Sequence, residues 1–232
     1  MKIAIIPARS GSKRIKNKNI RLFNGQPIIS WSIKEALKSK IFDKVIVSTD
    51  SKKIANISIK YGAEIPFLRK KSLSKDNISI PDVMKDAVNF YENNKINIDY
   101  ACLIYAASPL INSADLKKGF KLIKSNKYDF VISVSKFLSP INRSLLINKD
   151  LIKPTNKKNT YLHSQGFNEF YYDNAQFTFG KKNAWIENKH TFLVKSSYVK
   201  IPSYRSQDID TIEDWKRSEI LFKINQKNNK KK

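Results

Sequence analysis

Apolar residues recur along the chain in two patterns that predict two kinds of secondary structure. Short apolar runs rich in β-branched residues are typical of buried strands, and longer segments with apolar residues three or four positions apart are typical of helices that cover a sheet. The strands or extended segments predicted in this way are 2–7, 44–49, 63–68, 100–105, 129–135, 171–180 and 198–202. The predicted helices are 27–40, 51–61, 80–93, 115–125, 183–187 and 210–224. Because the two kinds of segment alternate through most of the chain, the pattern predicts an α/β fold with a mainly parallel sheet.

Residues at the ends of these segments support the predicted boundaries. Pro27 and Pro81 fall in the first turns of predicted helices, where the fixed φ of proline fits and its missing N–H is not needed. Gly62 follows the helix 51–61 as a stop signal. Thr211 is followed three residues later by Asp214, which is the spacing of a capping box at the start of the last helix.

The segment 141–170 shows neither pattern over any length. It is rich in Lys and Asn and contains short alternating stretches without a strong helical signal. We interpret it as an arm with short strands that projects from a single domain spanning 1–224. The last residues, 225–232, are polar and basic, and we expect them to form a disordered tail.

Composition narrows the class of protein. The chain has 232 residues, which is enough for one α/β domain with a sizeable core. Its apolar runs are too short to cross a membrane, and the first run is too short for a signal peptide, so we expect a cytoplasmic protein without membrane contact. Cys102 lies inside an apolar run, which indicates a buried strand residue.

The formal net charge of +24 has two interpretations. A surface that binds nucleic acid is one, and a general bias of the composition with local binding of small anions is the other. The cations are mostly lysines, scattered along the chain and mixed with Asn and Ile, which favours the second interpretation. A non-enzymatic nucleic-acid-binding module remains a distant alternative, because the sequence shows no paired zinc ligands and no aromatic RNA-binding strand motif.

A basic loop follows the first predicted strand and is the strongest candidate for a binding site. The small residues Ser10, Gly11 and Ser12 allow the backbone to approach a ligand, and Arg9 and Lys13 add positive charge. A strand that leads into such a loop is suited to bind a nucleotide triphosphate, although the spacing is neither that of a P-loop nor G-x-G-x-x-G. The alternative is a solvated basic turn without a ligand.

Two carboxylates near the last helix form a candidate metal site. In an extended segment Asp208 and Asp210 point to the same side, where their oxygens can share one Mg²⁺ with a triphosphate. Alternatively, Asp210 merely caps the helix that follows. Asp50 comes after the second predicted strand and is a weaker metal candidate, because either Asp50 or Ser51 can cap the helix 51–61.

Several short motifs follow one another between residues 2 and 222, and together they resemble a known family. They are A-R-S-G-S-K-R (8–14) with K-N (18–19), S-T-D (48–50), A-E-I-P-F-L-R (63–69), Y-A-A-S-P-L (105–110), Y-Y-D-N-A-Q-F-T-F-G (171–180) and Q-D-I-D-T-x-E-D-W (207–215). In this order they resemble the acylneuraminate cytidylyltransferases, and most closely the pseudaminic acid branch of that family. The resemblance implies a three-layer, Rossmann-like nucleotidyltransferase fold and a homodimer formed through the projecting arm.

The resemblance also implies a reaction and its site residues. The reaction is transfer of CMP from CTP to the anomeric hydroxyl of a nonulosonic (2-keto sugar) acid, with Mg²⁺ present and pyrophosphate released. Residues implied to bind the nucleotide are Ala8, Arg9, Ser10, Gly11, Ser12, Lys13, Asn19, Arg69, Asp76 and Ser79. Residues implied to bind the sugar acid are Tyr105, Ala106, Ser108, Arg143, Tyr172 and Gln176. Catalysis is implied for Arg9, Lys13, Asp208 and Asp210, of which the two aspartates would hold Mg²⁺.

The sequence departs from the family pattern in three places. Ser10 replaces a glycine, the segment 172–176 (Y-D-N-A-Q) replaces Y-H-D-A-G-Q, and the segment 163–166 (H-S-Q-G) replaces R-S-Q-D. The last two changes fall in the half implied to face the sugar. They leave open N-acetylneuraminic, legionaminic or a shorter keto-deoxy sugar acid as the acceptor. The sequence identifies no general base, and a metal that lowers the pKa of the sugar hydroxyl would make one unnecessary.

Overall fold

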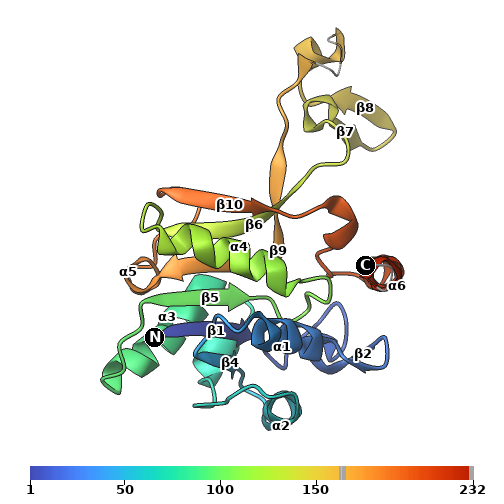
Figure 1. Cartoon of the computed structure of the whole chain (residues 1–232). Helices are drawn as coiled ribbons and strands as arrows, with labels where there is room; N and C mark the ends of the chain where they lie inside the picture. Colours follow the sequence, from blue (N-terminus) through green and yellow to red (C-terminus); the bar gives the residue numbers. More distant parts are fainter. Residues whose placement is uncertain (162, 164–165, 230–232) are drawn as a thin grey trace.

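The computed structural model describes residues 1–161, 163 and 166–229, and its middle layer is a six-stranded sheet in the order β10-β6-β9-β5-β1-β4 (Figure 1). The strands are β1 (Lys2–Pro7), β4 (Lys44–Ser48), β5 (Tyr100–Ile104), β6 (Phe130–Lys136), β9 (Tyr171–Lys181) and β10 (Ser196–Lys200). β9 is antiparallel to both of its neighbours, β5 and β6, and the other neighbouring pairs are parallel. The mainly parallel sheet predicted from the sequence is therefore confirmed.

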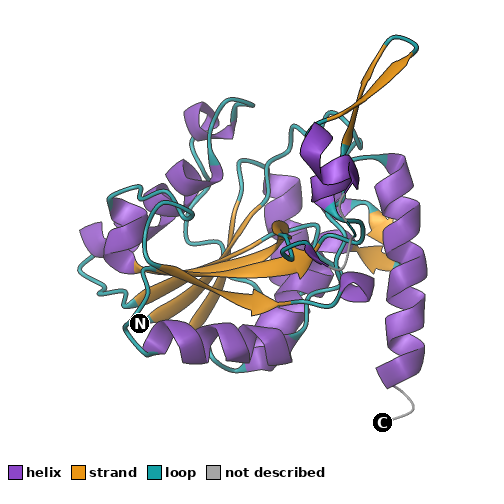
Figure 2. Ribbon diagram, turned by 90° about the horizontal axis from the view of Figure 1, so that it is seen from above, coloured by secondary structure: helices purple, strands orange, loops and turns teal. Residues whose placement is uncertain are grey.

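Helices cover both faces of this sheet, which makes the three layers visible in Figure 2. Alternate residues of β1 explain how: Ala4 and Ile6 pack on one side with α1, α2 and α4, whereas Ile3 and Ile5 pack on the other side with α3 and α5. The helices are α1 (Ile28–Ser39), α2 (Lys52–Lys60), α3 (Ile80–Asn93), α4 (Ser113–Lys124) and α5 (Lys182–Ile186). Cys102 is fully buried in β5, as predicted. The predicted three-layer α/β fold is confirmed.

The last helix, α6 (Ile212–Asn229), packs against residues near the start of the chain. Trp215 and Phe222 meet the ring of Phe23 edge-on, with centroids 5.5 and 5.4 Å away. Ile15 and Ile209 are buried in the same cluster. This packing brings the segment just before α6 against the basic loop that follows β1.

The start of α6 tests one of the two roles proposed for Asp210, that of a helix cap. The Thr211 hydroxyl accepts the Asp214 N–H at 3.2 Å, and the Asp214 carboxylate accepts the Thr211 N–H at 2.8 Å. The predicted capping box is thus present, and Asp210 is not needed as a cap. The end of the helix corrects another prediction: residues 225–229, expected to belong to a disordered tail, continue α6, and 230–232 lie outside the described residues.

The segment 63–68, predicted to be extended, does not become a strand of the sheet. It forms two isolated bridges instead. Glu64 pairs with Ile46 of β4, and Leu68 pairs with Thr49, the residue that follows β4. Pro66 lies between the two bridges and has no N–H to donate to a ladder, which accounts for the interruption. The predicted turn at 23–26 forms a small hairpin of β2 (Leu22–Phe23) and β3 (Gln26–Pro27). Its loop residues Asn24 and Gly25 have positive φ values of 45° and 87°.

An arm projects from the body between β6 and β9 (Figure 1). It carries two short 3₁₀ segments, Ile141–Arg143 and Lys157–Tyr161, and the antiparallel pair β7 (Leu145–Asn148) and β8 (Leu151–Pro154). The short strands predicted for this segment are therefore present. Several large apolar side chains on the arm are exposed, among them Ile147 at 77% and Ile152 at 64%.

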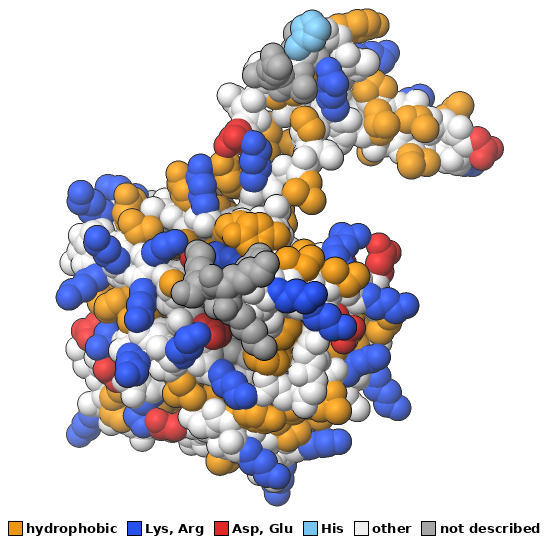
Figure 3. Space-filling model, turned by 45° about the vertical axis from the view of Figure 1, so that its right-hand side comes forward, with side chains coloured by type: hydrophobic (Ala, Val, Ile, Leu, Met, Phe, Trp, Pro, Cys, Tyr) orange, Lys and Arg blue, Asp and Glu red, His pale blue; other side chains and the backbone are white. Residues whose placement is uncertain are grey.

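On the face drawn in Figure 3, the distribution of charge agrees with the interpretation of the basic composition as a general bias. Figure 3 shows Lys and Arg side chains spread over the visible face and the arm, with acidic side chains between them. Within the described ranges, no helix is both long enough and apolar enough to span a membrane.

Candidate active site

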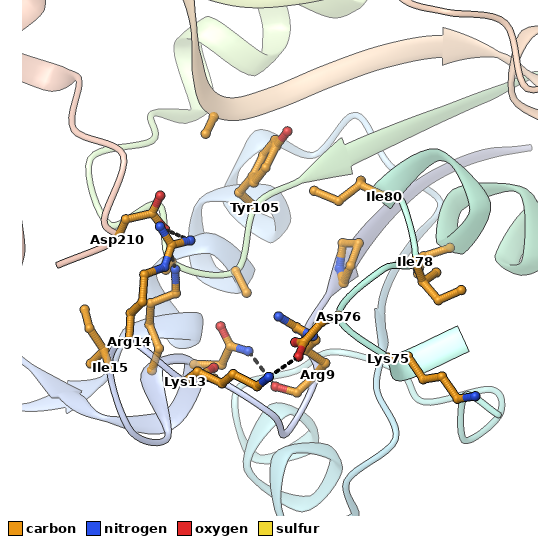
Figure 4. A pocket seen from close by; sticks show the side chains of 18 of the residues that line it. Arg9, Lys13, Arg14, Ile15, Lys75, Asp76, Ile78, Ile80, Tyr105 and Asp210 are labelled. Carbon is orange, nitrogen blue, oxygen red and sulfur yellow. Dashed lines mark hydrogen bonds and ion pairs between the residues drawn. The ribbon is translucent and has the colours of Figure 1, made fainter. Parts of the chain in front are cut away.

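A cleft of about 500 Å³ lies where β1 and β5 end, and the sequence-predicted site residues gather around it (Figure 4). Carboxyl ends of parallel strands are where ligands bind in open α/β sheets. The predicted residues that line the cleft are Arg9, Ser12, Lys13, Asn19, Arg69, Asp76, Tyr105, Ala106, Asp208 and Asp210. The loop after β1, the loop after β5 and the segment before α6 therefore converge on one site.

Hydrogen bonds hold the loop after β1 in place from behind. Asp50 accepts the Ser10 N–H at 2.9 Å and the Ser10 hydroxyl at 2.7 Å. Desolvation alone would raise the pKa of Asp50, but these bonds from Ser10 outweigh it, so the pKa is lowered and the carboxylate stays charged. Ser51 caps α2 by accepting the Ile54 N–H, which leaves Asp50 free for the loop. The serine that replaces a family glycine thus has a structural partner, and Asp50 positions the loop.

One end of the cleft holds two cations against a single carboxylate. Arg9 forms an ion pair with Asp76, and the Lys13 Nζ lies 2.5 Å from the second Asp76 oxygen (Figure 4). The hydrogen bonds from Lys13 and Arg9 lower the pKa of Asp76. Asn19 steadies this end because its amide donates to the Arg9 carbonyl at 3.0 Å. Arg69 lies behind it, 5% exposed, and burial lowers the pKa of its guanidinium.

The other end of the cleft holds the paired carboxylates. The Asp210 carboxylate lies 2.8 Å from Arg14 Nη2 and 3.5 Å from Lys18 Nζ. Lys18 also donates to the Ile209 carbonyl at 2.7 Å. Asp208 is exposed, although the surrounding protein still removes part of its hydration. This partial desolvation, followed by repulsion from Asp210, raises the pKa of Asp208, with Lys18 opposing the shift. Both aspartates therefore lie at this end of the cleft, and their binding of a shared cation stays a prediction.

The wall of the cleft near β9 is held by backbone contacts. Ser108 donates its hydroxyl proton to the Ala175 carbonyl at 2.7 Å, and the Tyr105 N–H donates to the Gln176 carbonyl at 3.0 Å. Tyr172 and Ser206 share a hydrogen bond of 3.2 Å between their hydroxyls. These side chains support the wall, whereas the Tyr105 ring faces the cleft (Figure 4).

Eight predicted residues do not line this cleft, and their contacts with substrate stay predictions. They are Ala8, Ser10, Gly11, Ser79, Ser108, Arg143, Tyr172 and Gln176. Ala8 is buried, and Ser79 caps α3 by accepting the Asp82 N–H at 3.2 Å. Arg143 lies on the arm with its guanidinium 5.8 Å from the Phe167 ring.

The departures from the family pattern fall partly on β9. The β6–β9 register shifts there, and Ala175 adopts a positive φ of 52°. The buried Asn174 donates to the Ser135 hydroxyl at 2.9 Å, which ties β9 to β6. Asp173 accepts the Ala175 N–H at 3.0 Å, and burial raises its pKa. Ser164 and Gln165, in the other departing segment, lie outside the described residues.

Several residues of the cleft were not among the predicted site residues. The cleft is also lined by Arg14, Lys18, Lys75, Ile78, Ile80 and Ala175. Arg14 and Lys18 belong to the basic loop that the sequence identified, but a run of cations does not show which of them face inward. Lys75 and Ile78 carry no signal in the sequence, because only folding of the loop before α3 brings them here.

Comparison with known proteins places the chain among enzymes that use CTP. Residues 3–227 match the family model described as cytidylyltransferase. The chain is 38% identical over 224 residues to the pseudaminic acid cytidylyltransferase of Campylobacter jejuni subsp. jejuni, covering 96% of this chain and 97% of that protein. It is 32% identical over 231 residues to the CMP-N,N'-diacetyllegionaminic acid synthase of Legionella pneumophila, covering 97% of each. The solved structure of CMP:2-keto-3-deoxy-manno-octonic acid synthetase complexed with CTP has the same fold, with a TM-score of 0.71 and 13% identity over 97% of this chain and 99% of that one.

Proposed function

Because this chain belongs to the cytidylyltransferase family, we propose that it transfers CMP from CTP to the anomeric hydroxyl of a nonulosonic acid and releases pyrophosphate. The observation that carries the proposal is the cleft itself, in which cations of the loop after β1 stand opposite the paired carboxylates Asp208 and Asp210. Cations suit a triphosphate, and two carboxylates suit the metal that accompanies it. The name of the relative with 38% identity makes pseudaminic acid the first acceptor to test, and the name of the relative with 32% identity makes a legionaminic acid the second.

The chain's own groups act mainly by positioning and by neutralising charge. Arg9 and Lys13 bind the triphosphate, and Asn19 and Asp50 keep their loop in shape. The acceptor hydroxyl attacks the α-phosphorus in line with the departing pyrophosphate. Fixed cations then stabilise the negative charge that develops on the phosphate oxygens. Residues 69–79 and the start of α3 contribute Arg69, Ile78 and Ile80 as a wall for the base and ribose.

Mg²⁺ is the cofactor we propose, and the residues of the cleft fit it. Within the described ranges no cluster of three or more His, Cys, Asp or Glu side chains is placed to hold a metal ion. Mg²⁺ is commonly bound by one or two carboxylates together with substrate phosphates, which is the donor set that Asp208 and Asp210 would complete. When bound, the metal would neutralise phosphate charge and lower the pKa of the sugar hydroxyl.

The acceptor is tested by comparing kcat/KM for CMP transfer to different sugar acids. We expect pseudaminic acid to be preferred over N-acetylneuraminic, legionaminic and keto-deoxy acids. Mass analysis of the CMP-sugar identifies each product. Preference for another of these acids would retain the reaction and correct the acceptor.

Asp76 gives a prediction about nucleotide affinity. It occupies Arg9 and Lys13, which the triphosphate needs, so a nucleotide must first displace it. Asp76→Asn weakens both ion pairs, and we expect the Kd for CTP, measured by titration calorimetry, to fall about two- to tenfold. Glu64→Gln is the matched control. It breaks the surface ion pair between Glu64 and Lys44, which is equally short at 2.5 Å and does not line the cleft. Weaker CTP binding by Asp76→Asn would instead mean that Asp76 contacts the nucleotide, as the family resemblance implies.

The arm supports a homodimer, which we propose together with a cytoplasmic location. Ile147 and Ile152 are cross-strand partners on the β7–β8 pair, and both are largely exposed in the single chain. A large apolar surface on a projecting segment is suited to association with a second copy.

Sedimentation of arm variants tests the dimer. We expect the wild-type chain to sediment as a dimer and Ile147→Glu to sediment as a monomer with an unchanged unfolding temperature. Ile59→Glu, on α2, is the control because Ile59 is also exposed, at 55%, but lies on the body. A monomeric wild type, or a dimer that survives Ile147→Glu, would contradict this role of the arm.

A further inference from the structure

The two ends of the cleft have the same arrangement of charge, with different residues. At one end Asp76 holds Arg9 and Lys13, and at the other Asp210 holds Arg14 and Lys18 (Figure 4). The reaction proposed above brings two anionic groups to this site, the triphosphate of CTP and the carboxylate of the acceptor acid. The first has its cations in Arg9 and Lys13. A cation for the second is not assigned in the cleft.

We propose that Arg14 binds the carboxylate of the acceptor sugar acid, an inference that rests on the proposed function. In the present structure the Arg14 guanidinium already pairs with a carboxylate, because its Nη2 lies 2.8 Å from Asp210 Oδ1. A planar guanidinium can bind the two oxygens of a carboxylate at once. The pair with Asp210 thus shows that Arg14 can bind a carboxylate at this end of the cleft.

The two cations at this end differ in exposure and in their other contacts, which leaves Arg14 freer than Lys18 to change partners. The Lys18 side chain is 25% exposed and is also tied to the Ile209 carbonyl at 2.7 Å. The Arg14 side chain is 68% exposed. Arg14 can therefore leave Asp210 at little cost, while Lys18 continues to compensate the charge of that carboxylate.

The chemistry of the acceptor places its carboxylate near Arg14. In a 2-keto sugar acid the carboxylate is bonded to the anomeric carbon, which also carries the attacking hydroxyl. The attacking oxygen and the carboxylate are therefore bonded to the same carbon, and they must lie in the same part of the cleft. Asp208 and Asp210 mark the end of the cleft at which the attack takes place, and Arg14 contacts that end.

Other arginines are placed less well for this role. Arg9 is paired with Asp76 at the opposite end, among the groups assigned to the triphosphate. Arg69 is 5% exposed, and its Nε donates to the Ser74 hydroxyl at 3.1 Å. Arg143, which the family resemblance implied for the carboxylate, lies on the arm and does not line the cleft of its own chain.

The variant Arg14→Gln tests this role, because binding of the acceptor and binding of the nucleotide can be measured separately in it. Titration calorimetry measures the Kd for pseudaminic acid in the presence of Mg²⁺ and α,β-methylene CTP, which is not turned over, and separately the Kd for CTP. Because a charge-assisted pair is lost, we expect the Kd for the acid to rise about 10- to 100-fold, while the Kd for CTP stays within about twofold. Arg14→Lys should fall between, since lysine keeps the charge but loses the fork.

A substrate analogue and a matched variant complete the experiment. The C1 carboxamide of the acid should bind the wild type much more weakly than the acid does, and Arg14→Gln should lose most of that discrimination. Arg217→Gln is the control: Arg217 is also exposed and pairs with a carboxylate, Glu213 at 3.1 Å, but it lies on α6 outside the cleft. It should leave both Kd values unchanged.

Each outcome either supports or overturns the role of Arg14. A higher Kd for CTP with an unchanged Kd for the acid would assign Arg14 to the nucleotide. Unchanged values for both would leave Arg14 as a partner of Asp210 alone. If wild-type protein binds CTP but transfers CMP to no sugar acid, the proposed function fails, and that result is independent of the Arg14 variants.

Discussion

Asp208→Asn should lower the rate of pyrophosphate release about 100-fold or more at a fixed Mg²⁺ concentration, and should raise the Mg²⁺ concentration needed for half-maximal rate. The amide has nearly the shape of the carboxylate, but its oxygen is neutral and is a weaker ligand for a hard cation. Loss of charge stabilisation at the reacting phosphate accounts for the size of the effect. Initial rates over a series of Mg²⁺ concentrations measure both quantities.

The same substitution should not destabilise the fold. The pKa of Asp208 is raised by desolvation and by Asp210, so folding disfavours the charged form of this group. A group whose pKa is raised on folding contributes least to stability above its folded pKa, and a neutral amide avoids that cost. We therefore expect an unchanged or slightly higher Tm.

A control at the opposite edge of the sheet gives the Asp208 result its meaning. Asp129 precedes β6 at its amino-terminal end, and Asp129→Asn removes one carboxylate without touching the cleft. It should leave the Mg²⁺ dependence unchanged. If Asp208→Asn also retains wild-type Mg²⁺ dependence, Asp208 does not belong to the metal site.

Lys13→Ala should weaken CTP binding and reduce kcat/KM about 10- to 100-fold, because a charge-assisted contact with the triphosphate is lost. The Lys13 side chain is 80% exposed, so its removal opens no cavity and should not change Tm. Titration with CTP and steady-state kinetics measure the two effects. Lys44→Ala removes a lysine with the same ion-pair length, 2.5 Å, and should leave both values unchanged.

The sign of the effect distinguishes two roles for this loop. Lys13→Ala removes a group that binds the nucleotide, whereas Asp76→Asn removes a competitor for it, so the two variants should change the Kd for CTP in opposite directions. Wild-type kinetics in Lys13→Ala would show that the loop is structural and that the triphosphate lies elsewhere.

The sequence predicts elements best where local signals agree with packing. The sequence predicts the helix 80–93 with the same bounds as α3, because Pro81 suits its first turn and Val83, Met84 and Val88 recur on one face. The structure adds a cap from Ser79. The segment 63–68 looks equally apolar, yet it forms only isolated bridges with β4. Whether an extended segment joins a sheet depends on its neighbours, and a local pattern does not contain them.

In the candidate site, too, the sequence predicts what depends on local residue types and does not predict contacts between distant segments. The sequence identified the basic loop and the aspartate pair, because their residue types and spacing carry chemistry. It could not identify the pairs Arg9–Asp76 and Arg14–Asp210, since these form only when segments far apart in the chain meet. It also gave Asp210 two roles, and the Thr211–Asp214 capping box removes one of them.

The most direct test of the account is pyrophosphate release by the wild-type protein with CTP, Mg²⁺ and pseudaminic acid. We expect release that requires all three components, together with an equal amount of CMP-sugar. Omitting the acid separates transfer from simple hydrolysis of CTP, and replacing CTP by ATP, GTP or UTP tests the base. Protein that neither binds CTP nor releases pyrophosphate with any of the sugar acids would contradict the assignment of the cleft as a cytidylyltransferase site.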